Sequence, residues 1–276
     1  MTTRRSSSAP PLVLATIRVR HLEQNRPLSR ELEQALRADP RPSAQALLES
    51  ISRRRRANRA EGQRLRHMLR FERELWDRDV TRIAGVDEAG MSPLAGPVAA
   101  AAVILKVGWR APHVNDSKQL DAKEREQLAV LIKREALAYA VAFVEPDEID
   151  ALNIYWAGLR AMQRAVEALG VEPEHLLIDA RKLKELSVAQ TRIVRGDALS
   201  LSIAAASILA KTARDARMVE YDRAYPAYGF AQHKGYPVRQ HLLALAQHGP
   251  CPIHRRSFAP VQQAAGLAVT EHSLEA

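Results

Sequence analysis

Residues 85–98 read Gly-Val-Asp-Glu-Ala-Gly-Met-Ser-Pro-Leu-Ala-Gly-Pro-Val and are the most informative part of the chain. A short apolar run, Ile83 to Val86, ends here in two adjacent carboxylates, Asp87 and Glu88, and a loop rich in Gly and Pro follows. The next apolar run, 98–105, is long enough for a buried strand. Because a carboxylate at the end of a buried strand has lost much of its water, it needs a cation or a proton. The stretch predicts a divalent-metal site; the alternative is a surface Asp-Glu pair at a strand end.

The pattern around this stretch predicts an α/β fold. Residues 83–87 and 98–105 are linked too closely for a helix, so they should pair antiparallel. Further strands are expected at 138–144 and 175–179, with a possible edge strand at 193–197. Helices are expected at 121–135, from Pro146 to Leu169 with Tyr155 and Trp156 in the apolar set, and at 202–218. Strands that alternate with helices after a hairpin indicate a mixed β-sheet flanked by helices.

Composition narrows the class of protein. The 276 residues are enough for one sizeable core and an appendage, and the apolar content of 46% is normal for a globular protein. No stretch approaches the roughly 18 apolar residues of a membrane span, and the start of the chain does not resemble a secretory signal. The single cysteine, Cys251, excludes an intramolecular disulfide and a cysteine-based zinc cluster. We expect a cytoplasmic protein.

Nearly all of the net charge of +9 lies in the first 80 residues, where every basic residue other than histidine is an arginine. The densest part is Arg53 to Arg56. Arginines at this density attract phosphate backbones by counterion release, so they favour nucleic-acid binding. A solvated helix face without a ligand is the alternative.

The chain is expected to have three parts: a basic helical extension over 1–80, a catalytic domain over 81–261 and a tail over 262–276. Residues 1–10 are polar and rich in serine, so they are expected to be disordered. Helical patterns cover 13–25 and 29–39, and prolines at 40 and 42 interrupt them. A longer helix is expected from Ser43, as its cap, to about Asp77.

Four acids stand at comparable places: Asp87 and Glu88 after the first strand, Asp179 after a later one, and Asp197 before the last predicted helix. Ligands gather at the carboxyl ends of strands in open α/β sheets. Carboxylates without cysteine partners suit Mg²⁺ or Mn²⁺. Because adjacent strand residues point to opposite faces, Asp87 and Glu88 can share a site only if the strand ends between them.

Residues 82–261 resemble ribonuclease HII, the bacterial type 2 ribonuclease H. Six segments carry the resemblance, in the order of the family: 85–105, 115–120, 176–180, 196–215, 225–236 and 249–261. The extension is similar, more weakly, to the helical N-terminal segment of some bacterial members. The resemblance implies an RNase H-like fold.

The resemblance also implies a function. The expected reaction is endonucleolytic hydrolysis on the 5′ side of a ribonucleotide, in RNA/DNA hybrid or in duplex DNA with embedded ribonucleotides, leaving 3′-hydroxyl and 5′-phosphate ends. Such an enzyme would remove ribonucleotides in replication and repair. The resemblance implies that Asp87, Glu88, Asp179 and Asp197 hold two Mg²⁺ or Mn²⁺ ions. A monomer is expected.

The family's substrate contacts map onto a further set of positions. Tyr236 matches a tyrosine that stacks under the deoxyribose next to the ribonucleotide. A loop near the substrate phosphates and a polar helix face near the nucleic acid supply the remaining matches: Asn115, Ser117, Lys118, Ser207 and Lys211. Each could instead have a local structural role, as turn packing, a helix cap or a hydrogen-bonded helix face. Exposed groups at His233, His254, Arg255 and Arg256 could touch the nucleic-acid backbone or simply be solvated.

One departure from the family concerns the loop Gly90-Met91-Ser92, where members usually have Gly-Arg-Gly. There the resemblance implies backbone contacts to the ribose 2′-hydroxyl, which separates RNA from DNA. Met91 supplies no cation, and Ser92 adds a side chain that disfavours a positive φ. The resemblance therefore implies cleavage, while this loop departs from the family at the position that implies strict preference for the junction. Two alternatives remain: another acid-cluster enzyme such as a DNA-strand transferase, and a non-catalytic nucleic-acid-binding protein.

Overall fold

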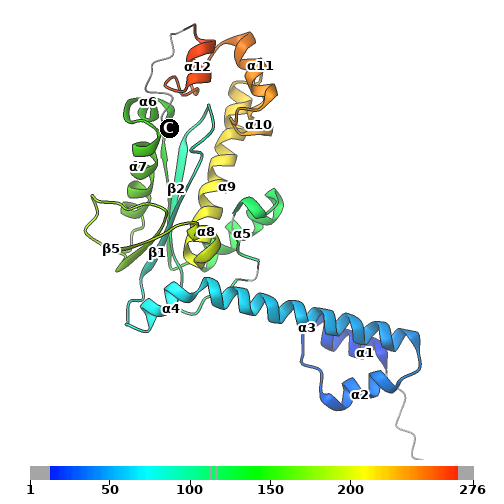
Figure 1. Cartoon of the computed structure of the whole chain (residues 1–276). Coiled ribbons are helices and arrows are strands. Elements are labelled where there is room, and N and C mark those ends of the chain that lie inside the picture. Colours follow the sequence, from blue (N-terminus) through cyan, green and yellow to red (C-terminus); the bar gives the residue numbers. More distant parts are fainter. Residues whose placement is uncertain (1–12, 112, 116, 267–276) are drawn as a thin grey trace, which may run out of the picture. The chain divides into compact units, whose positions relative to one another are not determined.

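The computed structural model describes residues 13–111, 113–115 and 117–266 (Figure 1). The chain divides into two compact units, Met1–Arg64 and Leu65–Ala276. The expected disorder of residues 1–10, and the tail beyond residue 266, lie outside the described residues. Each unit is described by itself.

The first unit is helical, as predicted. Helix α1 (Leu14–Arg18) continues into the π-helical turn η1 (Val19–Glu23), and α2 (Arg30–Ala38) and α3 (Pro42–Met68) follow. Ser29 begins α2, because its Oγ accepts a hydrogen bond from the Leu32 amide at 3.2 Å. A small apolar core holds the unit together: Ile17, Leu28, Leu36, Ala44, Leu47, Leu48 and Ile51.

The second unit contains a five-stranded mixed sheet in the order β3-β2-β1-β4-β5. Its strands are β1 (Ile83–Ala89), β2 (Val98–Ile104), β3 (Ala138–Val144), β4 (His175–Asp179) and β5 (Ala189–Ile193). Strand β2 pairs antiparallel with both β1 and β3, whereas β4 pairs parallel with both β1 and β5. The predicted hairpin and mixed sheet are confirmed.

The predicted edge strand at 193–197 is wrong. The edge strand is β5, which ends at Ile193. The chain then turns through Arg195 in the left-handed region (φ 57°) and enters the short helix α8 (Gly196–Leu199). Asp197 therefore lies in a helical turn.

Helices cover both faces of the sheet (Figure 1). On one face, α9 (Leu201–Ala224) packs on β1 and β2, with α5 (Ala122–Glu135) beside it. On the other face, α7 (Ile154–Glu167) packs on β1, β2 and β3. Gly85 allows α9 to approach β1 closely, since a Cβ at this position would lie 2.1 Å from the backbone carbonyl carbon of Ser202.

The predicted helix from Pro146 to Leu169 is two helices. Helix α6 (Pro146–Leu152) stops at Asn153, which has a φ of 67° and caps α7 by accepting hydrogen bonds from the amides of Tyr155 and Trp156. The new helix direction leaves both aromatic side chains exposed, at 52% for Tyr155 and 55% for Trp156. Their expected place in the apolar set of the helix is therefore wrong.

The boundary between the units falls earlier than the predicted residue 80. The helix expected to reach Asp77 breaks at Leu69, and α4 (Arg70–Trp76) follows. Leu65, Met68 and Leu69 pack with residues of α5 and α9 in the core of the second unit. Glu72 is fully buried, and its Oε1 accepts hydrogen bonds from the Ser200 hydroxyl at 2.7 Å and the Ser202 amide at 2.9 Å. Residues 65–76 thus belong with the sheet because they complete its core.

Several further helices were not predicted. The short helix η2 (Ser117–Gln119) precedes α5. Towards the C-terminus, α10 (Phe230–His233), α11 (Arg239–His248) and α12 (Ala259–Ala264) follow α9. None of the helices within the described ranges has both the length and the apolar content for crossing a membrane.

Candidate active site

The carboxylates of Asp87 and Glu88 lie on opposite sides of β1. Asp87 faces α9, where the Ser207 hydroxyl is near enough to lower the pKa of Asp87 against the larger effect of burial. Glu88 faces α7, and its Oε1 lies 3.6 Å from Nε of Arg181. Because β1 continues to Ala89, the expectation that the strand ends between the two acids is wrong. They meet instead at the end of the sheet, one from each face.

The other two acids reach the same end of the sheet. Asp179 ends β4 and directly follows Ile178, which pairs with Val86 of β1. Its Oδ1 accepts a hydrogen bond from the Gly196 amide at 2.6 Å, which connects β4 to α8. Asp197 is buried on α8, and its Oδ2 contacts Nζ of Lys118 at 3.0 Å. The turn after β5 thus brings Asp197 next to β4.

The carboxylates are close enough to affect one another's charge. Burial raises the pKa of Asp87 well above its usual range, and the charges of Glu88, Asp179 and Asp197 add to this rise. Burial also raises the pKa of Glu88, against the opposing charge of Arg181. The pKa of Asp179 rises through burial as well, although the hydrogen bond from Gly196 opposes it. Negative charge is therefore costly at this site without a cation.

The donor set fits a hard divalent cation. The oxygens are all carboxylates, and Oε2 of Glu88 is buried with no hydrogen-bond partner. Across the ranges that the structure describes, no three His, Cys, Asp or Glu side chains already form a group that could hold a metal ion. The four acids therefore share one end of the sheet and influence one another's charge, without forming a metal-binding group among the described residues.

Two protein-family models match the sequence of the chain. The model of the ribonuclease HII family matches residues 84–261, and that of the ribonuclease HII N-terminal domain matches residues 19–76. The chain belongs to the ribonuclease HII family. The second match supports the resemblance expected for the N-terminal extension.

Relatives in the ribonuclease HII family match over most of the chain. Ribonuclease HII of an Anaeromyxobacter species is 60% identical, over 95% of this chain and 83% of its own length. Ribonuclease HII of Myxococcus xanthus is 58% identical, over 92% of this chain and 87% of its own length. The crystal structure of ribonuclease H2 from Pyrococcus horikoshii has a TM-score of 0.57 at 24% identity and covers 67% of this chain and 97% of that one. Its likeness confirms the RNase H-like fold.

The loop before α5 lies at the carboxylate cluster. The Ser117 hydroxyl is buried and lies 2.9 Å from the Ser207 hydroxyl, which is itself near Asp87. Lys118 is largely exposed and contacts Asp197. Asn115 instead donates to Oε1 of Gln119 at 3.0 Å, which is a local role within the loop.

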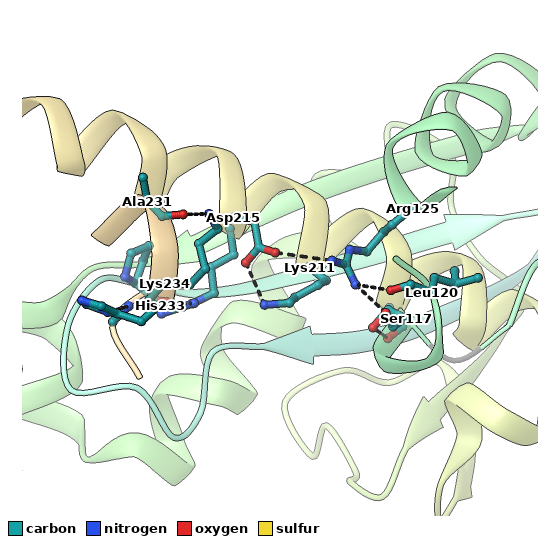
Figure 2. Close-up of polar contacts among 12 residues, drawn as sticks. Ser117, Leu120, Arg125, Lys211, Asp215, Ala231, His233 and Lys234 are labelled. Atoms are coloured by element: carbon teal, nitrogen blue, oxygen red, sulfur yellow. Dashed lines mark hydrogen bonds and ion pairs between the residues drawn. The ribbon is translucent and has the colours of Figure 1, made fainter. Parts of the chain in front are cut away.

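Lys211 lies one turn after Ser207 on α9 and belongs to an ion-pair network. Figure 2 shows Asp215 between Lys211 and Arg125; the Lys211 Nζ is 2.7 Å from Asp215 Oδ1, and Arg125 Nη2 is 3.8 Å from Asp215 Oδ2. Arg125 also donates to the carbonyl of Ser117 at 2.5 Å. Burial lowers the pKa of Lys211, although its bond to Asp215 opposes this. The network holds the Ser117 loop against α9.

Tyr236 is 37% exposed and lies near the same helix. Its ring centroid is 5.6 Å from Nζ of Lys211 and 6.0 Å from Cζ of Arg214. Because Lys211 is four residues from Ser207, this places Tyr236 roughly one helical turn from the hydroxyl near Asp87. The exposed ring can therefore contact a ligand that also reaches the carboxylates.

Two buried arginines shape the loops around the cluster. Arg255 donates to the carbonyls of Gly90 at 2.6 Å, Met91 at 3.1 Å and Gly96 at 2.9 Å. Arg214 donates to Ala95, Pro97 and Lys234. Burial lowers the pKa of each arginine. The sequence motifs contain both residues, but nothing in the local pattern shows that their donors all go to backbone carbonyls.

The departure at Met91 and Ser92 leaves the loop backbone intact. Gly90 has a φ of 93°, and a Cβ there would lie 2.0 Å from Nε of Arg214, so only glycine fits. Ser92 is exposed and is not among the described non-glycine residues with a positive φ. The expected conflict between the Ser92 side chain and a positive φ is therefore absent. The Met91 side chain packs toward Gly158 of α7.

The exposed roles expected for His233, His254 and Arg255 are wrong, because all three are buried; Arg256 is exposed. His254 lies 3.0 Å, between Nε2 atoms, from His241, and the His241 ring stacks on His233 with centroids 4.5 Å apart. His241 Nδ1 lies 3.0 Å from the carbonyl of Tyr236. This histidine cluster therefore supports the segment that carries Tyr236.

Acid is expected to destabilise the second unit through this cluster. Burial lowers the pKa of His254 from 6.5 to about 4, so the neutral form is favoured in the folded state. His254 thus contributes about 3 kcal/mol to the free energy of unfolding. This contribution is complete above pH 6.5 and is lost as the pH falls toward about 4. Urea unfolding from pH 7.5 to 4.5 measures this, and His254→Gln should reduce the slope. An unchanged slope in the variant would contradict the assignment.

Proposed function

We propose that the protein is a metal-dependent endoribonuclease that cuts on the 5′ side of a ribonucleotide in RNA/DNA hybrid or in duplex DNA with embedded ribonucleotides. The products would be 3′-hydroxyl and 5′-phosphate ends, as in ribonucleotide removal during replication and repair. The observation that carries this proposal is the gathering of four carboxylates at one end of the sheet, in a chain of the ribonuclease HII family.

Asp87, Glu88, Asp179 and Asp197 would hold Mg²⁺ or Mn²⁺, which when bound lower the pKa of the attacking water and stabilise charge on the leaving oxygen. The chain positions three of these acids through polar contacts: the Ser207 hydroxyl lies near Asp87, the Gly196 amide donates to Asp179, and Lys118 donates to Asp197. Lys118, exposed at the rim, can also contact a phosphate of the substrate.

Recognition of the ribose would use the Gly90-Met91-Ser92 loop. Arg255 fixes the Gly90 and Met91 carbonyls, which presets the direction of the neighbouring amides. Tyr236 would stack on the sugar next to the ribonucleotide, with its backbone held by His241. Asn115, Ser117, Ser207 and Lys211 would support or contact the substrate strand.

The test uses a labelled DNA duplex with a single ribonucleotide. With Mg²⁺ or Mn²⁺ we expect one cut on the 5′ side of the ribonucleotide, and with EDTA none. An all-DNA duplex of the same sequence should stay intact. Binding without cleavage in both ions would favour the non-catalytic alternative.

The first unit is proposed to add affinity for the duplex. Arg54, Arg55 and Arg59 line a pocket of about 280 Å³ in this unit, together with His21 and Arg26. Because Leu65 to Glu72 belong to the core of the second unit, a deletion that tests the first unit should remove residues 1–64 only.

We expect the 1–64 deletion to weaken duplex binding and to flatten its salt dependence, since each lost phosphate contact lowers the salt slope by roughly 0.9. Cleavage at saturating enzyme should persist. Titrations at several salt concentrations measure the slope. The same slope in the deletion variant would indicate a role in structure or partner docking.

A further inference from the structure

A pocket beside the carboxylate cluster has no role in the function proposed above. It has a volume of about 340 Å³ and lies between α7 and the segment after β4. This is within the size range of ligand sites. Its lining residues come from these two segments and from the end of α6: Leu152, Tyr155, Trp156, Leu159, Arg160, Gln163, Lys182, Leu183, Lys184 and Glu185.

Two aromatic rings stand at this pocket with more than half of their surface exposed, Tyr155 and Trp156. Their ring planes are nearly perpendicular, at 84°, with centroids 5.3 Å apart. Asn153 fixes both residues by accepting hydrogen bonds from their amides. Large apolar groups held exposed at the edge of a hollow indicate a binding surface.

The charge of the pocket is mostly positive. Arg160, Lys182 and Lys184 are exposed, against one acid in the lining, Glu185. Among the residues described in the structure, none of the three cations forms an ion pair within the 4 Å limit. Exposed aromatic rings with cations beside them are the combination that binds single-stranded nucleic acid, by stacking of bases and attraction of phosphates.

Arg181 connects the pocket to the carboxylates. Its Nε is 3.6 Å from Glu88 Oε1, and its Cζ lies 4.8 Å from the ring centroid of Tyr155. The Nη1 of Arg181 is buried without a hydrogen-bond partner. Because the phosphates of one strand recur roughly every 3.4 Å along the axis of a duplex, a strand at Glu88 reaches the pocket within a few nucleotides.

We propose that this pocket binds an unpaired nucleic-acid segment flanking the cleavage site. A base of that segment stacks on Trp156, while Lys182, Lys184 and Arg160 contact its phosphates. The occupant is single-stranded, because a base within a duplex has both faces covered by its neighbours. The inference rests on the proposed function, and it adds a preference for substrates with an unpaired flank.

The experiment measures binding alone, in EDTA, with all-DNA probes that cannot be cut at a ribonucleotide. One probe is a blunt duplex, and two others carry an unpaired extension at the 3′ or the 5′ end. The full chain should bind one of the extended probes about tenfold more tightly, toward the lower end of the range for one base–aromatic stack. Trp156→Ala should remove this gain without changing blunt-duplex affinity, and Trp156→Phe should retain most of it.

The second part of the experiment tests the role of positive charge by comparing two double variants that lose the same charge. Lys182→Gln with Lys184→Gln should reduce both the gain and its salt dependence, whereas Lys123→Gln with Lys133→Gln on α5 should not. Quenching of tryptophan fluorescence by the extended probe should disappear in Trp156→Phe. Equal affinity of the full chain for all three probes, or an unchanged gain in Trp156→Ala, would overturn the inference. The cleavage assay tests the proposed function separately, since neither result depends on the other.

Discussion

Asp87→Asn is expected to slow cleavage by roughly 10³-fold or more, the upper end for loss of one preorganised electrostatic contact in an active site. Asp87 is buried at the centre of the cluster and is affected by the charges of the other three acids. Replacing one carboxylate oxygen by an amide nitrogen removes a ligand from a set of hard oxygen donors. Single-turnover cleavage of the one-ribonucleotide duplex measures the loss.

The same substitution should raise the stability of the metal-free protein. Because burial and neighbouring charges raise the pKa of Asp87, its ionised form opposes folding near neutral pH, and this cost grows as the pH rises. The asparagine variant should therefore unfold at a higher temperature in EDTA, and Mg²⁺ or Mn²⁺ should raise its melting temperature less than that of the unmodified protein.

Glu167→Gln is the matched control for Asp87→Asn, since it removes one carboxylate from the exposed end of α7. It should change neither cleavage nor the response to metal. Unmodified turnover of Asp87→Asn in Mg²⁺ would refute the metal-site assignment. Lost activity together with lost duplex binding would instead indicate misfolding, which the melting temperature reports independently.

Gly85→Ala is expected to have the largest effect on stability, a loss of more than about 3 kcal/mol, the upper end of the usual cost of overpacking. The new Cβ would lie 2.1 Å from the carbonyl carbon and 2.2 Å from the carbonyl oxygen of Ser202. Both contacts are with backbone, so β1 and α9 would have to separate. This loss is a large part of the 5–15 kcal/mol typical of a folded domain.

Gly158→Ala provides the contrast. A Cβ there would lie 3.0 Å from Sδ of Met91, which is the movable end of a flexible side chain. Alanine in place of glycine inside α7 favours the helix by up to about 1 kcal/mol, so the net change should be small. Urea unfolding of both variants measures the change in the free energy of unfolding. Equal stabilities would show that close packing of α9 on β1 is not required.

Much of the second unit could be predicted from local pattern. The apolar runs at 138–144 and 175–179 became strands with the predicted bounds, because most of their apolar side chains are buried or partly buried in the sheet. The strand predicted at 193–197 failed, since Val194 is exposed and Arg195 turns the chain. The break at Asn153 was missed, although asparagine is a common helix cap.

The candidate site, too, could be predicted only in part from the sequence. The four acids could be selected from the sequence because each stands at the end of an apolar strand or next to a helix start. Their partners could not, since Arg181, Ser207 and Gly196 approach them from other elements. The buried roles of Arg214 and Arg255 were also invisible, because all the carbonyls that they bind except that of Lys234 lie more than 100 residues away along the chain.

The sequence by itself therefore determined the class of fold, the family and the set of acids, because these follow from apolar periodicity and from residue types in a fixed order. Only the tertiary structure decided that Asp87 and Glu88 approach from opposite faces of β1, that residues 65–76 belong to the second unit, and that Tyr155 and Trp156 are exposed beside Arg181. Such properties depend on contacts between distant segments, whose geometry no local pattern contains.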